Sequence, residues 1–277
     1  MSLALDPPRR FGLPQLWICL TGIVWRESLR FLHQRERFIS ALVRPLVWLF
    51  IFAAGFRQTL GVSIIPPYDT YVLYEAYITP GLMAMIQLFN GMQSSLSMVY
   101  DREMGSMRML LVSPAPRWFL LTSKLIAGVA VSILQVYAYL IIAHFWEIDP
   151  PSWWGYLTVL PALMLSGLMM GALGMLLSSL IRQLENFAGV MNFVIFPMFF
   201  ASSALYPLWR VQEGSPWLAL VCQLNPFTYG VELIRFAFYQ KVDLFSLGVV
   251  AGCTTAFLAA AIYAYDPARG ILMRRGG

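Results

Sequence analysis

The stretch DREMGSMRMLLVSPAPRWFLLTSK, residues 101–124, is a short charged segment between two long apolar runs. The run before it, residues 76–100, has 25 residues without a formal charge, and the run after it, residues 125–146, has 22. A helix that crosses a bilayer needs about 20 apolar residues, so each run is long enough to span one. The sequence therefore predicts two transmembrane helices joined by a charged loop at one membrane face.

The charged loop has the pattern of a short surface helix. Three charged residues at 101–103 begin a helical turn, and Gly105 makes that turn more flexible. A mainly apolar run follows at 107–112. The sequence Ser-Pro-Ala-Pro at 113–116 then ends the helix, because proline lacks a backbone N–H and restricts the residue before it. An amphipathic helix of this kind docks on lipid or on a partner protein. The alternative is a solvated loop with incidental charges.

The composition excludes an ordinary soluble protein. Of the 277 residues, 59% are hydrophobic and 12% are charged, with a mean hydropathy of +0.66, whereas soluble domains have about 25% charged residues. The net charge of +5 does not indicate nucleic-acid binding, because the basic residues cluster beside the apolar runs. The three cysteines are far apart in the chain and there are only two histidines, so neither a metal site nor a disulfide framework is expected.

The distribution of apolar residues predicts an all-α polytopic membrane protein with a single domain over residues 1–277. Residues 13–37 place Arg26 and Arg30 opposite Trp17 and Phe31, which is typical of an amphipathic helix at a membrane interface. Six spans are expected, at residues 38–59, 76–100, 125–146, 154–181, 186–206 and 244–265.

Two of these spans have further features. In the span 38–59 we expect Arg44 to reach the nearby membrane interface with its long side chain. In the span 154–181, Gly167, Gly171 and Gly174 place small residues on one helix face, which predicts close contact with another helix.

The external segment 207–235 is apolar but interrupted by Pro216 and by the pair Asn225-Pro226. A re-entrant hairpin is expected here rather than another crossing, because broken helices need shelter from lipid. We expect Asn225 and Pro226 to supply the bend of an external gate. The loop at 101–116 lies on the other membrane face.

The basic residues indicate the orientation. With both termini on one side of the membrane, 15 of the 19 Lys and Arg residues fall in segments on that side. The positive-inside rule then places both termini and the charged loop in the cytoplasm. The pair Arg9-Arg10 before an apolar segment superficially resembles a signal peptide. No small-residue cleavage site follows, so we expect this segment to be retained.

Motifs for catalysis are missing from the sequence. Neither of its two lysines, Lys124 and Lys241, lies in a G-x-x-x-x-G-K-[ST] motif, so the chain cannot form that phosphate-binding loop. No nucleophile–base set and no metal-ligand cluster is evident. We therefore predict that the chain is not an enzyme and binds no cofactor directly, and that any ATP and Mg²⁺ are bound by a separate subunit.

Polar residues within the spans are candidates for a translocation pathway. Gln87 and Asn90 share a face of the second span, and Asn192 lies in the fifth. In hydrocarbon such groups face other helices or a cavity. They are expected to line a cleft between two subunits, and the alternative is that they form hydrogen bonds between packed helices.

The loop sequence R-E-x-G-S-x-R-x-L-L-V-S-P, starting at Arg102, resembles the first cytoplasmic loop of ABC-2 type permeases, the membrane subunits of ABC exporters. The segments FASSALYPL at 200–208 and LNPFTYGVELIR at 224–235 are similar to the pattern before the last span of that family. The resemblance implies that the loop carries a coupling helix, which sits in a groove of an ATPase subunit. Its docking residues would be Arg102, Glu103, Gly105 and Arg108.

The resemblance further implies an exporter of a hydrophobic or amphiphilic substrate across the bacterial inner membrane. It would act as a dimer of the permease, expected to be a homodimer, with ABC-type ATPase subunits and surrounding lipid but no nucleic acid. Two other interpretations are a stand-alone secondary transporter or channel, and a non-transporting membrane scaffold. A lone carrier has no use for a docking helix, and no mid-span carboxylate pair or inverted repeat is evident.

Overall fold

The computed structural model describes residues 12–33, 35–56, 66–103, 116–181 and 184–264, and in these ranges it contains helices and no β-strand. The prediction of an all-α protein is confirmed. The helices are α1 (Leu13–His33), α2 (Arg35–Phe56), α3 (Tyr74–Glu103), α5 (Arg117–His144), α6 (Trp154–Leu180), α7 (Leu184–Phe200), α8 (Leu208–Gly214), α9 (Pro216–Leu224), α10 (Pro226–Phe238) and α11 (Leu244–Ala264).

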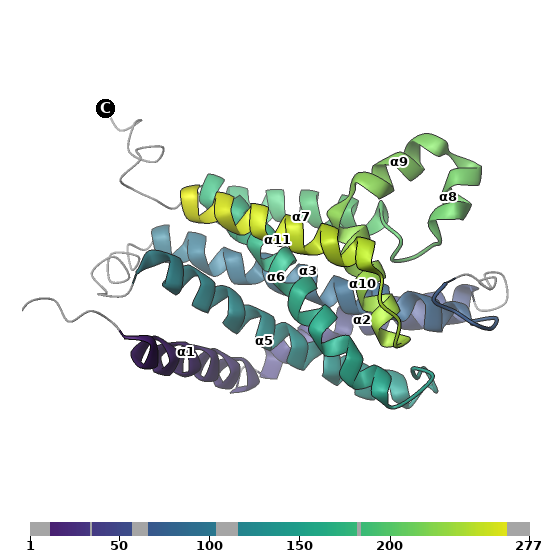
Figure 1. Ribbon diagram of the computed structural model, residues 1–277, viewed down its shortest axis with the longest axis horizontal. Helices are drawn as coiled ribbons and strands as arrows, with labels where there is room; N and C mark the ends of the chain where they lie inside the picture. The colour runs from purple at the N-terminus through teal and green to yellow at the C-terminus, as the bar shows by residue number, and fades with distance from the viewer. Residues whose placement is uncertain (1–11, 34, 57–65, 104–115, 182–183, 265–277) are drawn as a thin grey trace, which may run out of the picture.

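The helices form an elongated bundle around α3, which has 30 residues (Figure 1). Helices α2, α5, α6, α7 and α10 all pack against α3, and α11 packs against α6. Helix α1 lies beside the bundle, mainly against α5. We call the end that holds α8, α9 and the start of α3 the hairpin end. Because α3 contacts so many neighbours, its two faces decide what the interior of the bundle contains.

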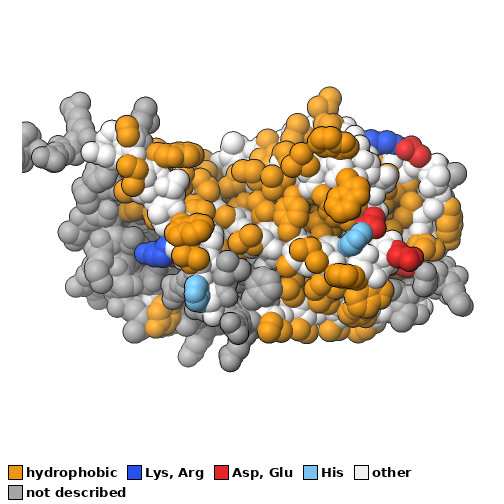
Figure 2. Space-filling view, turned by 90° about the horizontal axis from the view of Figure 1, so that it is seen from below, with side chains coloured by type: hydrophobic (Ala, Val, Ile, Leu, Met, Phe, Trp, Pro, Cys, Tyr) orange, Lys and Arg blue, Asp and Glu red, His pale blue; other side chains and the backbone are white. Residues whose placement is uncertain are grey.

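Three described helices are long and apolar enough to cross a bilayer. They are Trp118–His144, Trp154–Leu180 and Leu244–Ala264, with mean hydropathies of 2.2, 1.9 and 1.9. Two shorter apolar segments, Leu42–Ile51 and Gly189–Phe200, lie in α2 and α7. Figure 2 shows a face of the molecule on which hydrophobic side chains predominate and the few charged ones lie toward the two ends. The molecule is thus suited to a membrane, and the count of six spans stays a prediction.

Close packing of α3 on α6 depends on glycines. A Cβ added at Gly91 would lie 2.9 Å from the backbone of Gly171 on α6, and one added at Gly174 would lie 2.8 Å from the carbonyl oxygen of Gly91. Such distances leave no room for a side chain, so the two helix backbones are in direct contact. The close contact predicted for the small residues of α6 is confirmed.

Helix α5 begins at Arg117, eight residues before the start of the predicted span at 125. Pro116 precedes it with φ −64° and ψ 141°, the extended conformation that comes before a helix. The charged residues Arg117 and Lys124 therefore lie on the helix rather than in the loop. The predicted span at 125–146 starts inside this helix, and the point where the helix enters the membrane stays a prediction.

The segment after α7 is broken into α8, α9 and α10, as its prolines predicted. Asn225 ends α9, and its Oδ1 accepts a hydrogen bond from the N–H of Phe227 at 3.0 Å, which starts α10 with Pro226 in its first turn. The Nδ2 of Asn225 donates to the carbonyl oxygens of Met198 and Ala201, both at 2.7 Å. One side chain thus forms the break and ties the hairpin to the end of α7.

Candidate functional site

A cavity of about 160 Å³ lies among α2, α3, α5 and α7. Its lining joins polar to apolar side chains. The polar residues are Arg44, Asn90, Gln93, Gln135 and Asn192, and the others are Pro45, Met85, Ile86, Phe89 and Met191. The predicted pathway residues Asn90 and Asn192 are thus brought together from two helices that are far apart in the sequence.

The cavity lies at mid-length of the bundle and is open at its surface, where Arg44, Gln93 and Asn192 are exposed. Arg44 is nine residues after the start of α2 and Asn192 is eight residues after the start of α7. With a rise of about 1.5 Å per residue, both side chains start more than about 10 Å from the helix ends. The polar groups therefore lie along the length of the helices and not at their termini.

A hydrogen-bonded pair of amides forms one wall of the cavity. The Nδ2 of Asn90 donates to the carbonyl oxygen of Ile86 at 2.9 Å and to the Oε1 of Gln135. Gln135 has 0% of its surface exposed, and its Nε2 has no hydrogen-bond partner in the described part of the chain. A buried amide N–H without an acceptor is costly, and this one lies behind the surface of the cavity, because Gln135 has no accessible surface.

Arg44 brings a positive charge to the opposite wall. Its Cζ lies 3.8 Å from the centre of the Phe89 ring, a cation–π contact. Among the residues that the structure describes, no carboxylate forms an ion pair with Arg44. The expectation that Arg44 reaches the membrane interface stays a prediction, and the contact with Phe89 places its guanidinium beside the cavity.

Aromatic side chains bridge α2 and α7 between the cavity and the hairpin end. Trp48 contacts Phe199 and Phe200, with ring centres 5.8 and 5.6 Å apart. Phe196 stacks on Phe200 at 6.3 Å and contacts Phe89 at 6.5 Å. Trp48 follows Arg44 by one helical turn, and Phe196 follows Asn192 by one turn, so this aromatic layer lies next to the polar residues on the side of the hairpin end.

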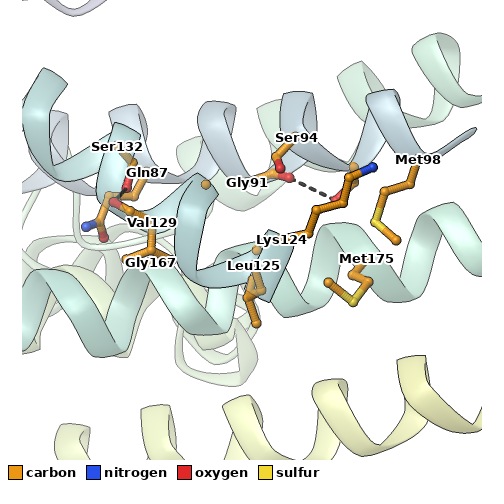
Figure 3. A pocket seen from close by; sticks show the side chains of 13 residues that line it. Gln87, Gly91, Ser94, Met98, Lys124, Leu125, Val129, Ser132, Gly167 and Met175 are labelled. Atoms are coloured by element: carbon orange, nitrogen blue, oxygen red, sulfur yellow. Dashed lines mark hydrogen bonds between the residues drawn. The ribbon is translucent and has the colours of Figure 1, made fainter. Parts of the chain in front are cut away.

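Gln87 lies on a different face of α3. It is 1% exposed, and its Nε2 donates to the carbonyl oxygen of Leu163 on α6 at 2.7 Å. It lines a second cavity between α3, α5 and α6, with Gln87 and Gly167 at one end and Met98 and Met175 at the other (Figure 3). That cavity holds about 10 Å³, room for roughly one water molecule. The structure therefore separates Gln87 from Asn90 and Asn192.

A second charged cluster lies at the hairpin end. Arg235 of α10 is 3% exposed and forms an ion pair with Glu232. Its NH2 group donates to the carbonyl oxygen of Ser203 at 2.7 Å, and its Cζ lies 4.2 Å from the centre of the Tyr77 ring. Tyr77 also donates to the Ser203 carbonyl, at 3.1 Å. The cluster therefore fixes α10 and the segment after α7 to the start of α3.

The segment before α3 adds to this cluster. Tyr68 packs on Tyr77 and Tyr239, with ring centres 6.0 and 4.8 Å apart, and burial raises the pKa of Tyr68 well above its ordinary value. Lys241 donates to the carbonyl oxygen of Pro67 at 2.8 Å and to Asp69 at 2.7 Å. Tyr68 therefore stays neutral, and the hairpin end is held by several links between distant segments.

Comparison with known proteins identifies the family of this chain. Residues 18–239 match the family model of the ABC-2 type transporter. The chain belongs to the ABC-2 type transporter family. This confirms the resemblance found in the charged loop and in the segments at 200–208 and 224–235. A member of this family is a membrane transport component, which is not itself catalytic, and the family implies an ABC-type ATPase partner in general.

Relatives within the ABC-2 family are named as permeases. The chain is 29% identical to the putative transport permease ycf38 of Cyanophora paradoxa over 75% of its own length and 70% of that protein. It is 24% identical to the protein of that name from Porphyra purpurea, and the match covers 87% of this chain and 82% of that protein. It is 27% identical to the probable multidrug ABC transporter permease YbhR of Escherichia coli over 64% of its length, and the match covers 47% of YbhR.

The predicted docking residues of the ABC-2 loop lie mostly outside the described residues. Gly105 and Arg108 are among residues 104–115, which the structure does not describe. Arg102 and Glu103 are described only as backbone, in the last turn of α3. What the structure does show is that the loop follows directly from the helix that lines the cavity.

Sequence analysis missed Arg44 as a site residue of this ABC-2 chain. The signal that could have found it is a charge inside an apolar segment, because such residues are expensive in a membrane and commonly mark function. Its nine-residue distance from the start of α2 also makes the interface hard to reach. The identity of its neighbours, however, is visible only in the fold.

Proposed function

We propose that the chain is the permease subunit of an ATP-driven exporter, which moves a hydrophobic or amphiphilic substrate out across the bacterial inner membrane. ATP and Mg²⁺ would be bound by a separate ABC-type ATPase subunit. The observation that carries this proposal is the cavity at mid-length of an ABC-2 bundle, where amide and guanidinium groups face methionine and phenylalanine. A lining of this kind suits a molecule with both polar and apolar parts.

The proposed topology has six spans, with both termini and the loop at 101–116 in the cytoplasm. Helices α2, α3 and α7 would join the three long apolar helices as spans. Helix α1 would lie at the interface, where its exposed Trp17 and Trp25 contact lipid. The hairpin end, with α8 to α10, would then face outward.

Two copies of the permease would complete the pathway. On α7, Asn192 is exposed beside Phe193, which is 79% exposed, and Phe196 and Phe200 continue this apolar surface. A second copy placed here would enclose the cavity between α2 and α7 of both chains, with Asn90 and Asn192 lining it. The hydrogen bond from Gln87 to α6 favours a packing role for that residue, and a pathway role for it would require α3 to turn away from α6.

The hairpin would act as the external gate. The two hydrogen bonds from Asn225 to the end of α7 mean that movement of α9 and α10 pulls on the helix that carries Asn192. The break at Pro226 allows α9 to change direction without bending α10. A substrate released from the cavity would leave past the aromatic layer toward this end.

Coupling to ATP hydrolysis would pass through the loop after α3. Arg102, Glu103, Gly105 and Arg108 are the proposed contacts with the ATPase subunit. Since α3 lines the cavity with Asn90 and ends at Glu103, displacement of the loop would move a cavity wall directly.

The experiment reconstitutes the permease with its ABC-type ATPase partner in proteoliposomes. The permease alone should neither bind nor hydrolyse ATP, and the Glu103→Lys complex should assemble but transport at least about tenfold less per ATP, as expected for a lost charged hydrogen bond. The matched control is Glu213→Lys, a charge reversal on exposed α8. ATP binding by the permease alone, or normal coupling in Glu103→Lys, would contradict the proposal.

A further inference from the structure

The cavity among α2, α3, α5 and α7 has a single formal charge. Of its ten lining residues only Arg44 is ionisable at neutral pH, and no acidic residue is among them. The other basic residues with described ion pairs each have an acidic neighbour: Arg26 pairs with Glu27, Arg235 with Glu232 and Lys241 with Asp69. The cavity is therefore positive, and its charge is balanced by no described side chain.

The cavity also presents more donors than acceptors. An arginine guanidinium has five N–H groups and no acceptor, and the face of Phe89 satisfies the charge without occupying those N–H groups. The Oε1 of Gln135 accepts from Asn90, which leaves its buried Nε2 as a donor without a partner. A group that satisfies the Arg44 N–H groups must be an acceptor with several lone pairs, and an oxyanion also balances the charge.

The volume limits what part of a ligand enters. About 160 Å³ is smaller than the roughly 300–1,000 Å³ of pockets that enclose a drug-sized molecule. It accommodates a phosphate or carboxylate headgroup but no long hydrocarbon chain. The exposed apolar side chains of Phe193 and Phe196 lie next to Asn192 on α7, where a chain attached to that headgroup would find contact.

We infer that this cavity binds the anionic headgroup, a phosphate or a carboxylate, of an amphiphile, with Arg44 as the counter-charge. The inference rests on the proposed function, in which the cavity belongs to the substrate pathway. An unpaired charge is costly in a membrane, and binding would neutralise it. The attraction between ligand and guanidinium would offset part of the free-energy cost of removing each of them from water.

The test measures binding of two amphiphiles with the same tail to the full chain in phosphatidylcholine nanodiscs. Radiolabelled dodecyl phosphate is the anionic probe, dodecyltrimethylammonium is the cationic one, and empty nanodiscs give the background. The wild-type chain should bind dodecyl phosphate at least about tenfold more tightly than the cation, which corresponds to one charged hydrogen bond. This comparison requires no variant, so it does not depend on the folding of a mutant.

Variants then test the assignment to Arg44. Arg44→Gln should weaken binding of dodecyl phosphate at least about tenfold and leave binding of dodecyltrimethylammonium unchanged. Arg44→Lys should retain more affinity than Arg44→Gln, because it keeps the charge but loses the forked donor. Arg26→Gln, on exposed α1, is the matched control and should bind as the wild type does.

The outcomes separate the alternatives. Equal affinity for both amphiphiles, or an Arg44→Gln chain that binds like the wild type, would overturn the inference. Competition by inorganic phosphate at the same concentrations as dodecyl phosphate would overturn the assignment to an amphiphile and indicate a free anion. The binding assay contains no ATPase, so it tests this inference independently of the proposed function. A preference for the anion without ATP-driven transport would contradict the proposed function alone. ATP-driven transport without that preference would contradict only this inference.

Discussion

Arg235 is buried among packed helices, whereas Arg44 is exposed at the edge of the cavity, and their partners differ as well. Arg235 has a carboxylate, a backbone carbonyl and an aromatic face, all supplied by the protein. Arg44 has the aromatic face of Phe89 and no ion pair within the described chain. A charge that the fold satisfies completely holds segments together, whereas a charge that the fold leaves unbalanced is available to a ligand. The same residue type thus forms a structural link at the hairpin end and, as we propose, a binding site in the cavity.

The largest expected effect follows from removing the satisfied charge. Arg235→Met should lower the free energy of unfolding by about 3–5 kcal/mol, because it leaves Glu232 without its partner near the buried end of α10. The same change at Arg44 should cost less than about 1 kcal/mol, since no carboxylate loses a partner. Unfolding in mixed micelles of increasing SDS content, followed by helical circular dichroism, measures both values.

A double variant sharpens the comparison of the two arginines. Arg235→Met combined with Glu232→Leu removes both charges and should recover part of the lost stability, as replacement of a whole buried pair commonly does. If Arg44→Met were as destabilising as Arg235→Met, then Arg44 would be a structural residue as well and the contrast would disappear.

A smaller effect is expected on the packed face of α3. Gly91→Ala should cost about 1–3 kcal/mol, because the added Cβ would lie 2.9 Å from the backbone of α6 and the helices would have to separate. Gly252→Ala on α11 is the control: nothing lies within 4 Å of an added Cβ there, so the higher helix propensity of alanine should leave stability equal or improved. The same SDS titration applies. An equal response at both glycines would mean that α3 and α6 tolerate separation.

The smallest effect concerns a charge at the surface. Asp149 accepts hydrogen bonds from Tyr156 at 2.5 Å and from His144 at 2.7 Å. Partial burial acts to raise the pKa of Asp149, but the two hydrogen bonds and the charge of His144 hold that pKa below its usual value. Its stabilising contribution is therefore present above the unfolded pKa of about 4 and is lost as the pH falls through the lower folded value.

Comparison of the wild type with Asp149→Asn at two pH values tests this contribution. The wild type should be more stable at pH 6 by less than about 1 kcal/mol, because the pair is solvent-exposed and screened. The difference should shrink at pH 3. A difference that stayed constant or grew on acidification would show that the carboxylate charge is not what stabilises this turn.

Much of the fold could be predicted from the sequence because it depends on local chemistry. The long apolar runs became helices, the Asn225-Pro226 pair broke the hairpin, and the glycines of α6 brought it close to α3. Helix α5 starts eight residues before the apolar run that predicted it, because hydropathy measures burial in lipid, whereas a helix starts and ends with its backbone hydrogen bonds. Local signals of this type do not depend on which helices become neighbours.

The site was less predictable for the opposite reason. Two residues three positions apart on a helix point in directions that differ by about 60° around the helix axis. This rotation is enough to turn Gln87 toward α6 while Asn90 faces α2, α5 and α7. The partner of Asn90, Gln135, is 45 residues away in the chain. Whether a polar residue packs or lines a cavity is therefore decided by the arrangement of helices, which no spacing within one helix reveals.

The glycine contact between α3 and α6 has a mechanical consequence. Where the two backbones touch directly, no flexible side chains lie between them that could absorb a displacement. Helices α3 and α6 should therefore move together as one rigid unit. With 30 residues, α3 is about 45 Å long, which exceeds the roughly 30 Å of a bilayer interior. Helix α3 therefore reaches from the hairpin end to the start of the charged loop. A displacement at either end of α3 would then reach the other end undiminished. The cavity would change shape by movement of α2 and α7 relative to α3.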